Sequence, residues 1–334
     1  MGGFMAVCVT DFVQGTLMLI GLLVVPLVAY FLLPGNLTDL ISQSGVTGGA
    51  GAYLNPFMNG DRPYTFIEIF SQLAWGFGYC GMPHVLVRFM AVKNEKELKK
   101  SWAIAIVWDL LSLTAAFAIA VIGRAYLLPV ILGENGAASS ESVFIEMIRK
   151  VFTSELALPF IGGLFLCGIL AAIMSTADSQ LLVTASAVSE DLYHSFIKKD
   201  ADTEEILKVS RITVIVIAVI AFAIAWNPDS SIMGLVSNAW AGLGSAFGPI
   251  VVMSLFWRRT NLPGAIAGMV TGGLTVIIWD YIPLVGGQTL GTYTGLYSLA
   301  VGFLLSLVMI VIVSLVTKAP SKEITDEFDR VAAK

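Results

Sequence analysis

The sequence has few charged residues. Only 13% of its 334 residues are Asp, Glu, Lys or Arg, whereas 57% are apolar and the mean hydropathy is +0.83. A soluble domain carries roughly a quarter charged residues, and its water-facing surface needs about that proportion. The shortage excludes a soluble enzyme and a disordered chain. Because the net charge is −5, the chain has no excess of positive charge that would attract nucleic acid, and no nucleic-acid partner is expected. An integral membrane protein remains.

Cysteine and histidine are also scarce. The three cysteines, Cys8, Cys80 and Cys167, are widely separated and form no CxxC pair, which excludes a disulfide scaffold and a zinc ribbon. The two histidines, His84 and His194, stand in no HExxH motif and in no Ser/His pairing. A membrane enzyme is therefore a weak alternative, and no cofactor is expected.

What the sequence does have is long apolar runs. A bilayer core needs about 20 mostly apolar residues per helix, and the alternation of a β-barrel is absent, so helices alone satisfy the backbone. The predicted fold class is an all-α integral membrane protein, with a transmembrane domain over 1–317 and a short charged tail over 318–334. About eight transmembrane helices are expected, over 11–33, 65–90, 101–128, 157–191, 208–226, 231–256, 263–283 and 292–317. The fourth run exceeds a membrane span, so its polar end, Ser189 to Lys199, is expected to project into water.

Lysine and arginine predict the orientation. With the N-terminus in the cytoplasm, 15 of the 19 basic residues lie in cytoplasmic segments, and only Arg62, Arg124, Arg149 and Lys150 lie outside. This asymmetry predicts a multi-pass protein of the cell membrane with its C-terminus in the cytoplasm. Two long external segments, 34–64 and 129–156, are interpreted either as plain connections or as gates over an outward vestibule.

The second apolar run contains Gly76-x-Gly78-x-x-Gly81, followed by Pro83. The glycines match the dinucleotide-binding fingerprint, but that fingerprint needs a preceding strand and a soluble βαβ unit. Three glycines and a proline within eight residues are poor helix formers, so we expect the helix to open near the bilayer midplane.

An opened helix in a membrane is where transporters hold substrates and ions. Trp75 and Tyr79 flank the expected gap, which favours a binding site there. The alternative is a glycine-packed helix interface of the small-xxx-small kind.

A stripe of small and hydroxyl-bearing residues lies on the fourth run. Ala172, Ser175, Thr176 and Ser179 are spaced i, i+3, i+4 and i+7, which places them on one helix face. Hard cations prefer oxygen ligands, so the stripe is a candidate Na⁺ site. The alternative is that the hydroxyls bond to carbonyls one turn earlier and merely permit close helix packing.

Placing a carboxylate within a membrane span costs free energy, so such a residue is a functional candidate by default. Asp178 lies near the hydroxyl stripe but off its face, whereas Asp11 and Asp109 lie in the first and third runs. Each is either a solvated end or a buried partner. Asp11 ranks above Asp109 because Thr10 and Gln14 form a polar turn around it, and Asp11 and Asp178 are kept as candidates for an ion pathway.

Three segments together resemble the sodium/solute symporter family, most closely its sodium/proline symporters. They are 74–84 continuing through 87–91, 171–182 with 189–193, and 2–4 with 10–14, the last resembling the sixth helix of the family. The resemblance implies a fold of two inverted five-helix repeats with extra helices outside them. It also implies that the Ala172 carbonyl and the hydroxyls of Ser175 and Thr176 bind Na⁺, and that Trp75, Tyr79 and Pro83 occupy proline-site positions.

The function implied is Na⁺-coupled symport of a small organic solute, expected to be L-proline, by alternating access. The partners expected are Na⁺, this solute and the lipid bilayer. Met82 and Cys80 stand where well-studied proline carriers have Gln and Phe, so other amino acids, pantothenate and small carboxylates remain alternatives. A membrane sensor or regulatory module of the same fold is the rival function.

The resemblance also bears on where the chain begins. Its first apolar run follows Met1-Gly2-Gly3 almost at once, without a preceding basic residue. On the family plan the chain holds the last helix of repeat one, all of repeat two and two trailing helices. We therefore expect a fragment that lacks the first helices, including a broken helix that supplies two further Na⁺ carbonyls, and that does not transport alone.

Overall fold

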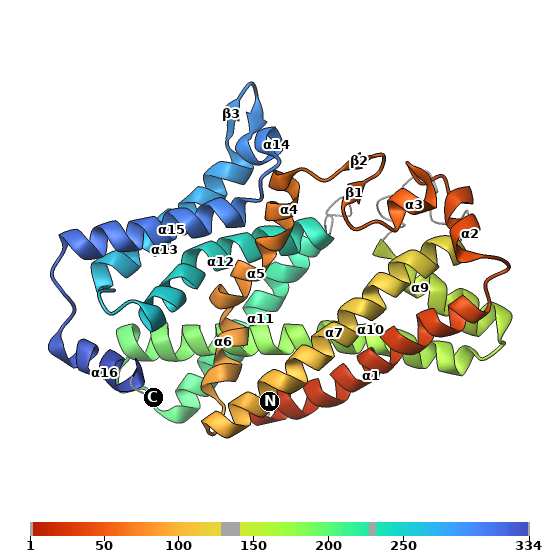
Figure 1. Ribbon diagram of the computed structural model, residues 1–334. Helices are drawn as coiled ribbons and strands as arrows, with labels where there is room; N and C mark the ends of the chain where they lie inside the picture. The colour runs from red at the N-terminus through yellow and green to blue at the C-terminus, as the bar shows by residue number, and fades with distance from the viewer. Residues whose placement is uncertain (1–2, 128–140, 227–231, 333–334) are drawn as a thin grey trace. The chain divides into compact units, whose positions relative to one another are not determined.

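The computed structural model describes residues 3–127, 141–226 and 232–332, and it is almost entirely helical (Figure 1). Contacts within the chain divide it into two compact units. Unit 1 comprises Met1–Pro63 and Val92–Asp229, and unit 2 comprises Tyr64–Ala91 and Ser230–Lys334. The candidate cation residues therefore belong to unit 1 and the candidate substrate residues to unit 2.

Unit 1 is built on four long helices. They are α1 (Gly3–Phe31), α7 (Glu95–Tyr126), α10 (Pro159–Ser186), which continues as the π-helix η4 (Ala187–Ile197), and α11 (Thr203–Ala225). Shorter elements connect them: α2 (Leu37–Gln43), α3 (Gly49–Tyr53), the hairpin β1–β2 (Met58–Asn59 and Arg62–Pro63), α9 (Val143–Ile148) and the π-helix η3 (Arg149–Glu155).

Three helices of unit 1, α1, α7 and α11, begin earlier than the apolar runs predict, and the last two start at polar N-caps. The side chain of Asn94 accepts a hydrogen bond from the Glu97 N–H at 3.0 Å, and that of Asp202 accepts one from the Glu205 N–H at 2.7 Å. These N-caps, with acidic residues in the first turn, stabilise helix starts that are polar. A hydropathy window detects only the apolar part of such a helix.

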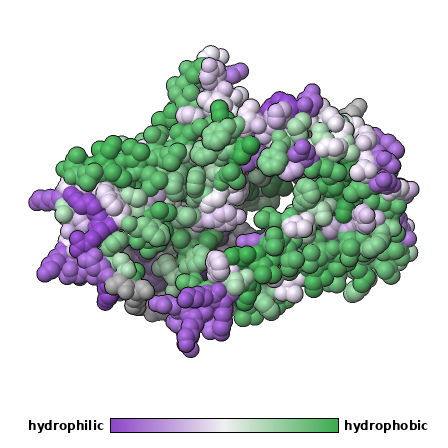
Figure 2. Space-filling view, in the orientation of Figure 1, coloured by the Kyte–Doolittle hydropathy of each residue, from purple (hydrophilic) through white to green (hydrophobic). Residues whose placement is uncertain are grey.

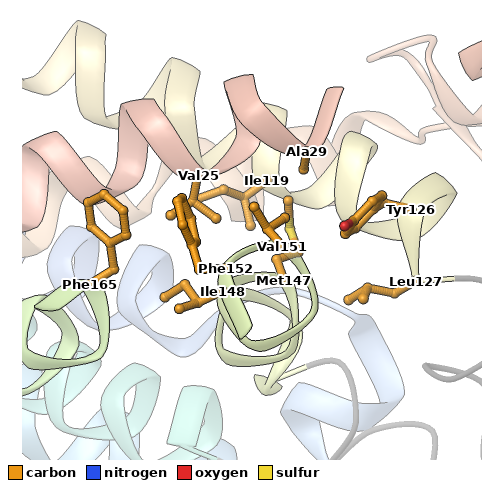
Figure 3. Packing of buried hydrophobic residues seen from close by; sticks show 10 residues of the cluster. All are labelled: Val25, Ala29, Ile119, Tyr126, Leu127, Met147, Ile148, Val151, Phe152 and Phe165. Carbon is orange, nitrogen blue, oxygen red and sulfur yellow. The ribbon is translucent and has the colours of Figure 1, made fainter. Parts of the chain in front are cut away.

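The core of unit 1 lies where α1, α7, α9, η3 and α10 meet (Figure 3). The Lys150 ammonium donates to the Tyr126 carbonyl at 2.7 Å and lies 4.3 Å from the centre of the Tyr126 ring, so the cation is held at the edge of this core. The buried side chains come from elements far apart in sequence: Val25, Ala29, Ile119, Tyr126, Leu127, Met147, Ile148, Val151, Phe152 and Phe165.

Unit 2 combines three long helices with a chain of short ones. The long helices are α12 (Ile232–Phe256), α13 (Leu262–Tyr281) and α15 (Ser298–Val316). The short elements are α4 (Phe66–Leu73), α5 (Trp75–Gly78), η1 (Tyr79–Gly81), α6 (Pro83–Met90), the hairpin β3–β4 (Pro283–Val285 and Gln288–Thr289), α14 (Leu290–Thr294) and α16 (Lys322–Ala332).

Small residues set the packing of α13 on α15. A Cβ atom at Gly264 would overlap Ser314, and one at Gly268 would overlap Ile310, so only glycine permits this approach. Asn261 fixes the start of α13, because its side-chain oxygen accepts from the Gly264 N–H at 2.9 Å while its amide donates to the Lys318 carbonyl at 2.7 Å.

The helix that ends the described chain, α16, is held by an ion pair. The Arg258 guanidinium donates to both carboxylate oxygens of Asp329, each at 2.7 Å. This bidentate pairing holds the pKa of the Asp329 carboxyl below its usual value. Protonation of Asp329 in strong acid would therefore release this contact.

Seven helices in the described part of the chain are long and apolar enough to cross a membrane: Met5–Phe31, Glu95–Tyr126, Pro159–Ile197, Thr203–Ala225, Ile232–Phe256, Leu262–Tyr281 and Ser298–Val316. Their apolar side chains largely face outward, and α11 has no buried residue in its most apolar window. Apolar atoms also dominate the flanks of α1 and α15 in Figure 2. The prediction of an all-α integral membrane protein is confirmed.

The expected run over 65–90 is not among these helices, because it is divided into α4, α5, η1 and α6. Of the two long external segments, 34–64 contains α2, α3 and the β1–β2 hairpin, whereas 129–140 of the second lies outside the described residues.

Candidate functional site

The candidate substrate site begins with the broken run in unit 2. Helix α4 starts at a capping box, in which Thr65 and Glu68 each accept from the other's backbone N–H, at 3.3 Å and 2.8 Å. After α5 and η1 the backbone turns extended at Met82, with ψ of 111°, and α6 starts at Pro83. Pro83 has no N–H to donate to the Tyr79 carbonyl one turn earlier, and that carbonyl accepts from the Met82 N–H at 3.4 Å instead. The run therefore opens at Met82.

The glycines of this run pack closely rather than form the opening. A Cβ at Gly78 would overlap the Trp240 indole on α12, and a Cβ at Gly81 would lie 2.6 Å from the Leu243 carbonyl oxygen. A Cβ at Gly76, in contrast, would meet nothing within 4 Å. The helix breaks as expected, and two of its glycines also form the close helix interface of the alternative interpretation.

Aromatic rings gather beside the break. The Trp75 ring stacks on Trp240, with centroids 5.2 Å apart and planes at 12°, and on Tyr297, at 6.2 Å and 14°. Tyr79 meets the Trp240 ring edge-on at 4.8 Å and is itself 52% exposed. Trp75 and Tyr79 therefore belong to one aromatic cluster, formed by Trp75, Tyr79, Trp240 and Tyr297.

Two members of the aromatic cluster were not singled out from the sequence. Trp240 donates its indole N–H to the Trp75 carbonyl at 3.0 Å, and Tyr297 donates its hydroxyl to the Ser237 carbonyl at 2.6 Å. The two hydrogen bonds hold the Trp240 and Tyr297 rings in place, and each of these rings also stacks on Trp75. The Gly244-x-x-x-Gly248 pattern beside Trp240 is the signal that could have indicated a closely packed partner helix.

Replacing Trp240 by phenylalanine tests whether the hydrogen bond from its indole to the Trp75 carbonyl stabilises the broken run. Trp240→Phe keeps an aromatic ring but removes the N–H, which leaves the Trp75 carbonyl without its donor at a cost of about 0.5–1.5 kcal/mol. We expect faster amide hydrogen exchange over Trp75–Gly78. Trp279→Phe is the matched control, because Trp279 donates to the Leu296 carbonyl, also at 3.0 Å. Equal exchange over Trp75–Gly78 in both variants and the unchanged protein would contradict the support role.

The candidate cation residues lie on one face of α10 in unit 1. The Ser175 hydroxyl donates to the Ala172 carbonyl at 3.0 Å, and the Thr176 hydroxyl lies 3.4 Å from the same oxygen. Two hydroxyl oxygens thus gather around one carbonyl oxygen. Such bonds to a carbonyl one turn earlier are what the packing alternative predicts. Rotation of the two hydroxyls would nevertheless turn their lone pairs toward a shared cation. Ser175 is half-buried and Thr176 is exposed within unit 1.

The fourth member of the stripe has a different partner. Ser179 is buried, and its hydroxyl lies 3.3 Å from a carboxylate oxygen of Asp11 on α1 and 2.9 Å from the Ser175 carbonyl. Asp11 is thereby brought beside the hydroxyl stripe. Asp178 instead lines a separate cavity within unit 1, and Asp109 is exposed on α7.

Comparison with known proteins identifies the family. Residues 1–272 match the model of the sodium:solute symporter family. The chain is 43% identical to the osmoregulated proline transporter OpuE of Bacillus subtilis, over 96% of this chain and 61% of the relative. It is 39% identical to the high-affinity proline transporter PutP of Bacillus subtilis, over 98% and 64%. It is 38% identical to the sodium/proline symporter of Escherichia coli, over 98% and 61%.

The chain therefore spans somewhat less than two thirds of the length of the curated relatives named here, while nearly all of it is matched by each. Both the family model and the relatives cover the broken run and the hydroxyl stripe. The chain belongs to the sodium:solute symporter family.

Proposed function

We propose that the chain acts in a carrier that couples Na⁺ to the transport of L-proline, as a secondary transporter rather than an enzyme. The observation that carries this proposal is the match of nearly the whole chain, at 38–43% identity, to relatives named as proline transporters or sodium/proline symporters. The geometry of both candidate sites supports it.

The solute site is assigned to the break in unit 2. Exposed Tyr79 and stacked Trp75 offer aromatic faces on which the pyrrolidine ring of proline can lie, and the loosened backbone before Pro83 offers carbonyl oxygens to its ammonium group. No charged side chain is needed for this arrangement, which suits a solute that must leave again.

The cation site is assigned to Ala172, Ser175 and Thr176 on α10. Their oxygens are neutral, so Na⁺ would keep its charge and bind with modest affinity, as a coupling ion must. Further oxygen ligands would come from groups other than these three. Asp11, one hydrogen bond away through Ser179, is the first candidate for the pathway of the ion, and Asp178 is the second.

In this proposal residues 1–317 lie in the cell membrane as the transport domain, with the 318–334 tail in the cytoplasm. Binding of Na⁺ to α10 favours the outward-open state, the solute binds at the break, and rocking of the helix bundle exposes both to the cytoplasm. Coupling requires that occupancy of one site change the affinity of the other.

The test uses the whole carrier in which the chain acts, reconstituted in lipid vesicles with an inward Na⁺ gradient. We expect accumulation of labelled L-proline that disappears without the gradient. Tyr79→Ala should raise the half-saturating proline concentration about tenfold, because an aromatic contact surface is lost. Tyr281→Ala, which removes another exposed tyrosine of unit 2, is the control. Equal half-saturation in both variants and the unchanged protein would remove Tyr79 from the site.

A further inference from the structure

A cavity lined by Asp178 and Arg211 lies in unit 1, apart from the hydroxyl stripe. It has a volume of about 460 Å³, within the range of small-molecule sites. Three helices line it, and the residues that each contributes are spaced as on one helix face. The lining residues are Ala6, Val7 and Thr10 of α1, Asp178, Leu181, Leu182 and Ala185 of α10, and Leu207, Ser210, Arg211 and Val214 of α11.

Two opposite charges line this cavity without pairing. Asp178 and Arg211 both face it, yet neither makes an ion pair or a side-chain hydrogen bond with any other described residue. Asp178 is half-buried and Arg211 is exposed, so both charged groups are available to a ligand that enters the cavity. The remaining wall is mostly aliphatic, and the hydroxyls of Thr10 and Ser210 are the other polar groups.

We propose that this cavity is a second solute site that binds a zwitterionic amino acid, with the carboxylate on Arg211 and the ammonium on Asp178. A guanidinium holds a carboxylate through two parallel hydrogen bonds. The cavity is neutral overall, so it favours a ligand with both charges over a lone cation or a lone anion. The aliphatic wall suits a compact ring such as that of L-proline.

The inference deepens the proposed function and rests on it for the choice of L-proline as ligand. The cavity lies near the Ser186 end of α10 and the Thr203 end of α11. In the proposed orientation these are the cytoplasmic ends, so the cavity would hold the solute after it leaves the break and before it enters the cytoplasm.

Equilibrium binding of labelled L-proline to the purified protein tests the proposal. We expect two sites per chain, one weakened about tenfold in Tyr79→Ala and the other weakened about tenfold or more in Arg211→Gln and in Asp178→Asn. Prolinamide, which lacks the carboxylate, and N-acetylproline, which lacks the ammonium, should fail to compete at the Arg211-dependent site. Arg211→Lys, which keeps the charge, should bind better than Arg211→Gln.

The control is Lys208→Gln, one turn from Arg211 on the same helix, where Lys208 pairs with Glu204 at 2.9 Å. Size-exclusion profiles identify any variant that does not fold. A single site per chain that is unaffected by Arg211→Gln and Asp178→Asn overturns this inference but leaves the proposed function standing. Two components of which neither is weakened in Tyr79→Ala would instead count against the proposed site at the break. Equal competition by prolinamide or N-acetylproline overturns the zwitterion assignment.

Discussion

Alanine at Gly81 is expected to weaken proline binding about a hundredfold. A Cβ there would lie 2.6 Å from the Leu243 carbonyl oxygen and 2.8 Å from both the Gly244 Cα and the Gly248 nitrogen. Overpacking costs about 1–3 kcal/mol. All three obstacles are backbone atoms of α12, which cannot turn aside, so we expect the upper end of that range and a displaced break. Labelled proline binding to the purified protein measures the effect.

The same motif supplies the control. Gly76→Ala adds the same methyl group five residues earlier, where nothing lies within 4 Å, and it should leave proline affinity within about twofold of the original because surface changes of this kind cost little. Similar losses in Gly76→Ala and Gly81→Ala would show that flexibility of the motif, rather than its packing on α12, is what binding needs. No effect in either variant would contradict the site itself.

Removing the hydroxyls of the α10 stripe is expected to raise the Na⁺ concentration needed for proline uptake. Ser175→Ala and Thr176→Ala each delete one oxygen from the group around the Ala172 carbonyl. An interaction between a charge and a hydrogen-bonding group is worth roughly 1.5–3 kcal/mol, so the half-activating Na⁺ concentration should rise at least about tenfold in each variant. The double variant should show no Na⁺ activation at all.

A matched control separates the two interpretations of these hydroxyls. Thr184 lies on the same helix, and its hydroxyl also bonds back one turn, to the Gln180 carbonyl at 2.7 Å. If the hydroxyls serve only helix packing, Thr184→Ala and Thr176→Ala should behave alike. If Thr176 binds Na⁺, Thr184→Ala should keep the original Na⁺ activation. Unchanged activation in Ser175→Ala and Thr176→Ala would reject the cation site.

Much of the fold could be predicted from the sequence because apolar length decides which segments cross a membrane. The expected runs over 231–256 and 263–283 differ from α12 and α13 by no more than two residues at either end. Helix starts were less predictable, since α7 and α11 begin at polar N-caps that hydropathy does not detect. Likewise, the expected run over 292–317 includes the end of α14 and a turn before α15.

The candidate site was predictable only in part. Glycine and proline content predicted that the run near Pro83 would open, because both residues disfavour helix. Composition could not show which glycines pack against a neighbouring helix, since only the structure of α12 shows that Gly78 and Gly81 are packed and Gly76 is not. Trp240 was missed for the same reason: its role depends on a hydrogen bond to a residue 165 positions away.

The most direct test of the account is the mutual effect of the two ligands on the purified protein. The dissociation constant of L-proline is measured at low and at saturating Na⁺, and that of Na⁺ is measured without and with saturating L-proline. Coupled binding requires both constants to fall by one common factor, expected to be about 5–150-fold. A proline affinity that is the same with and without Na⁺ would contradict the account.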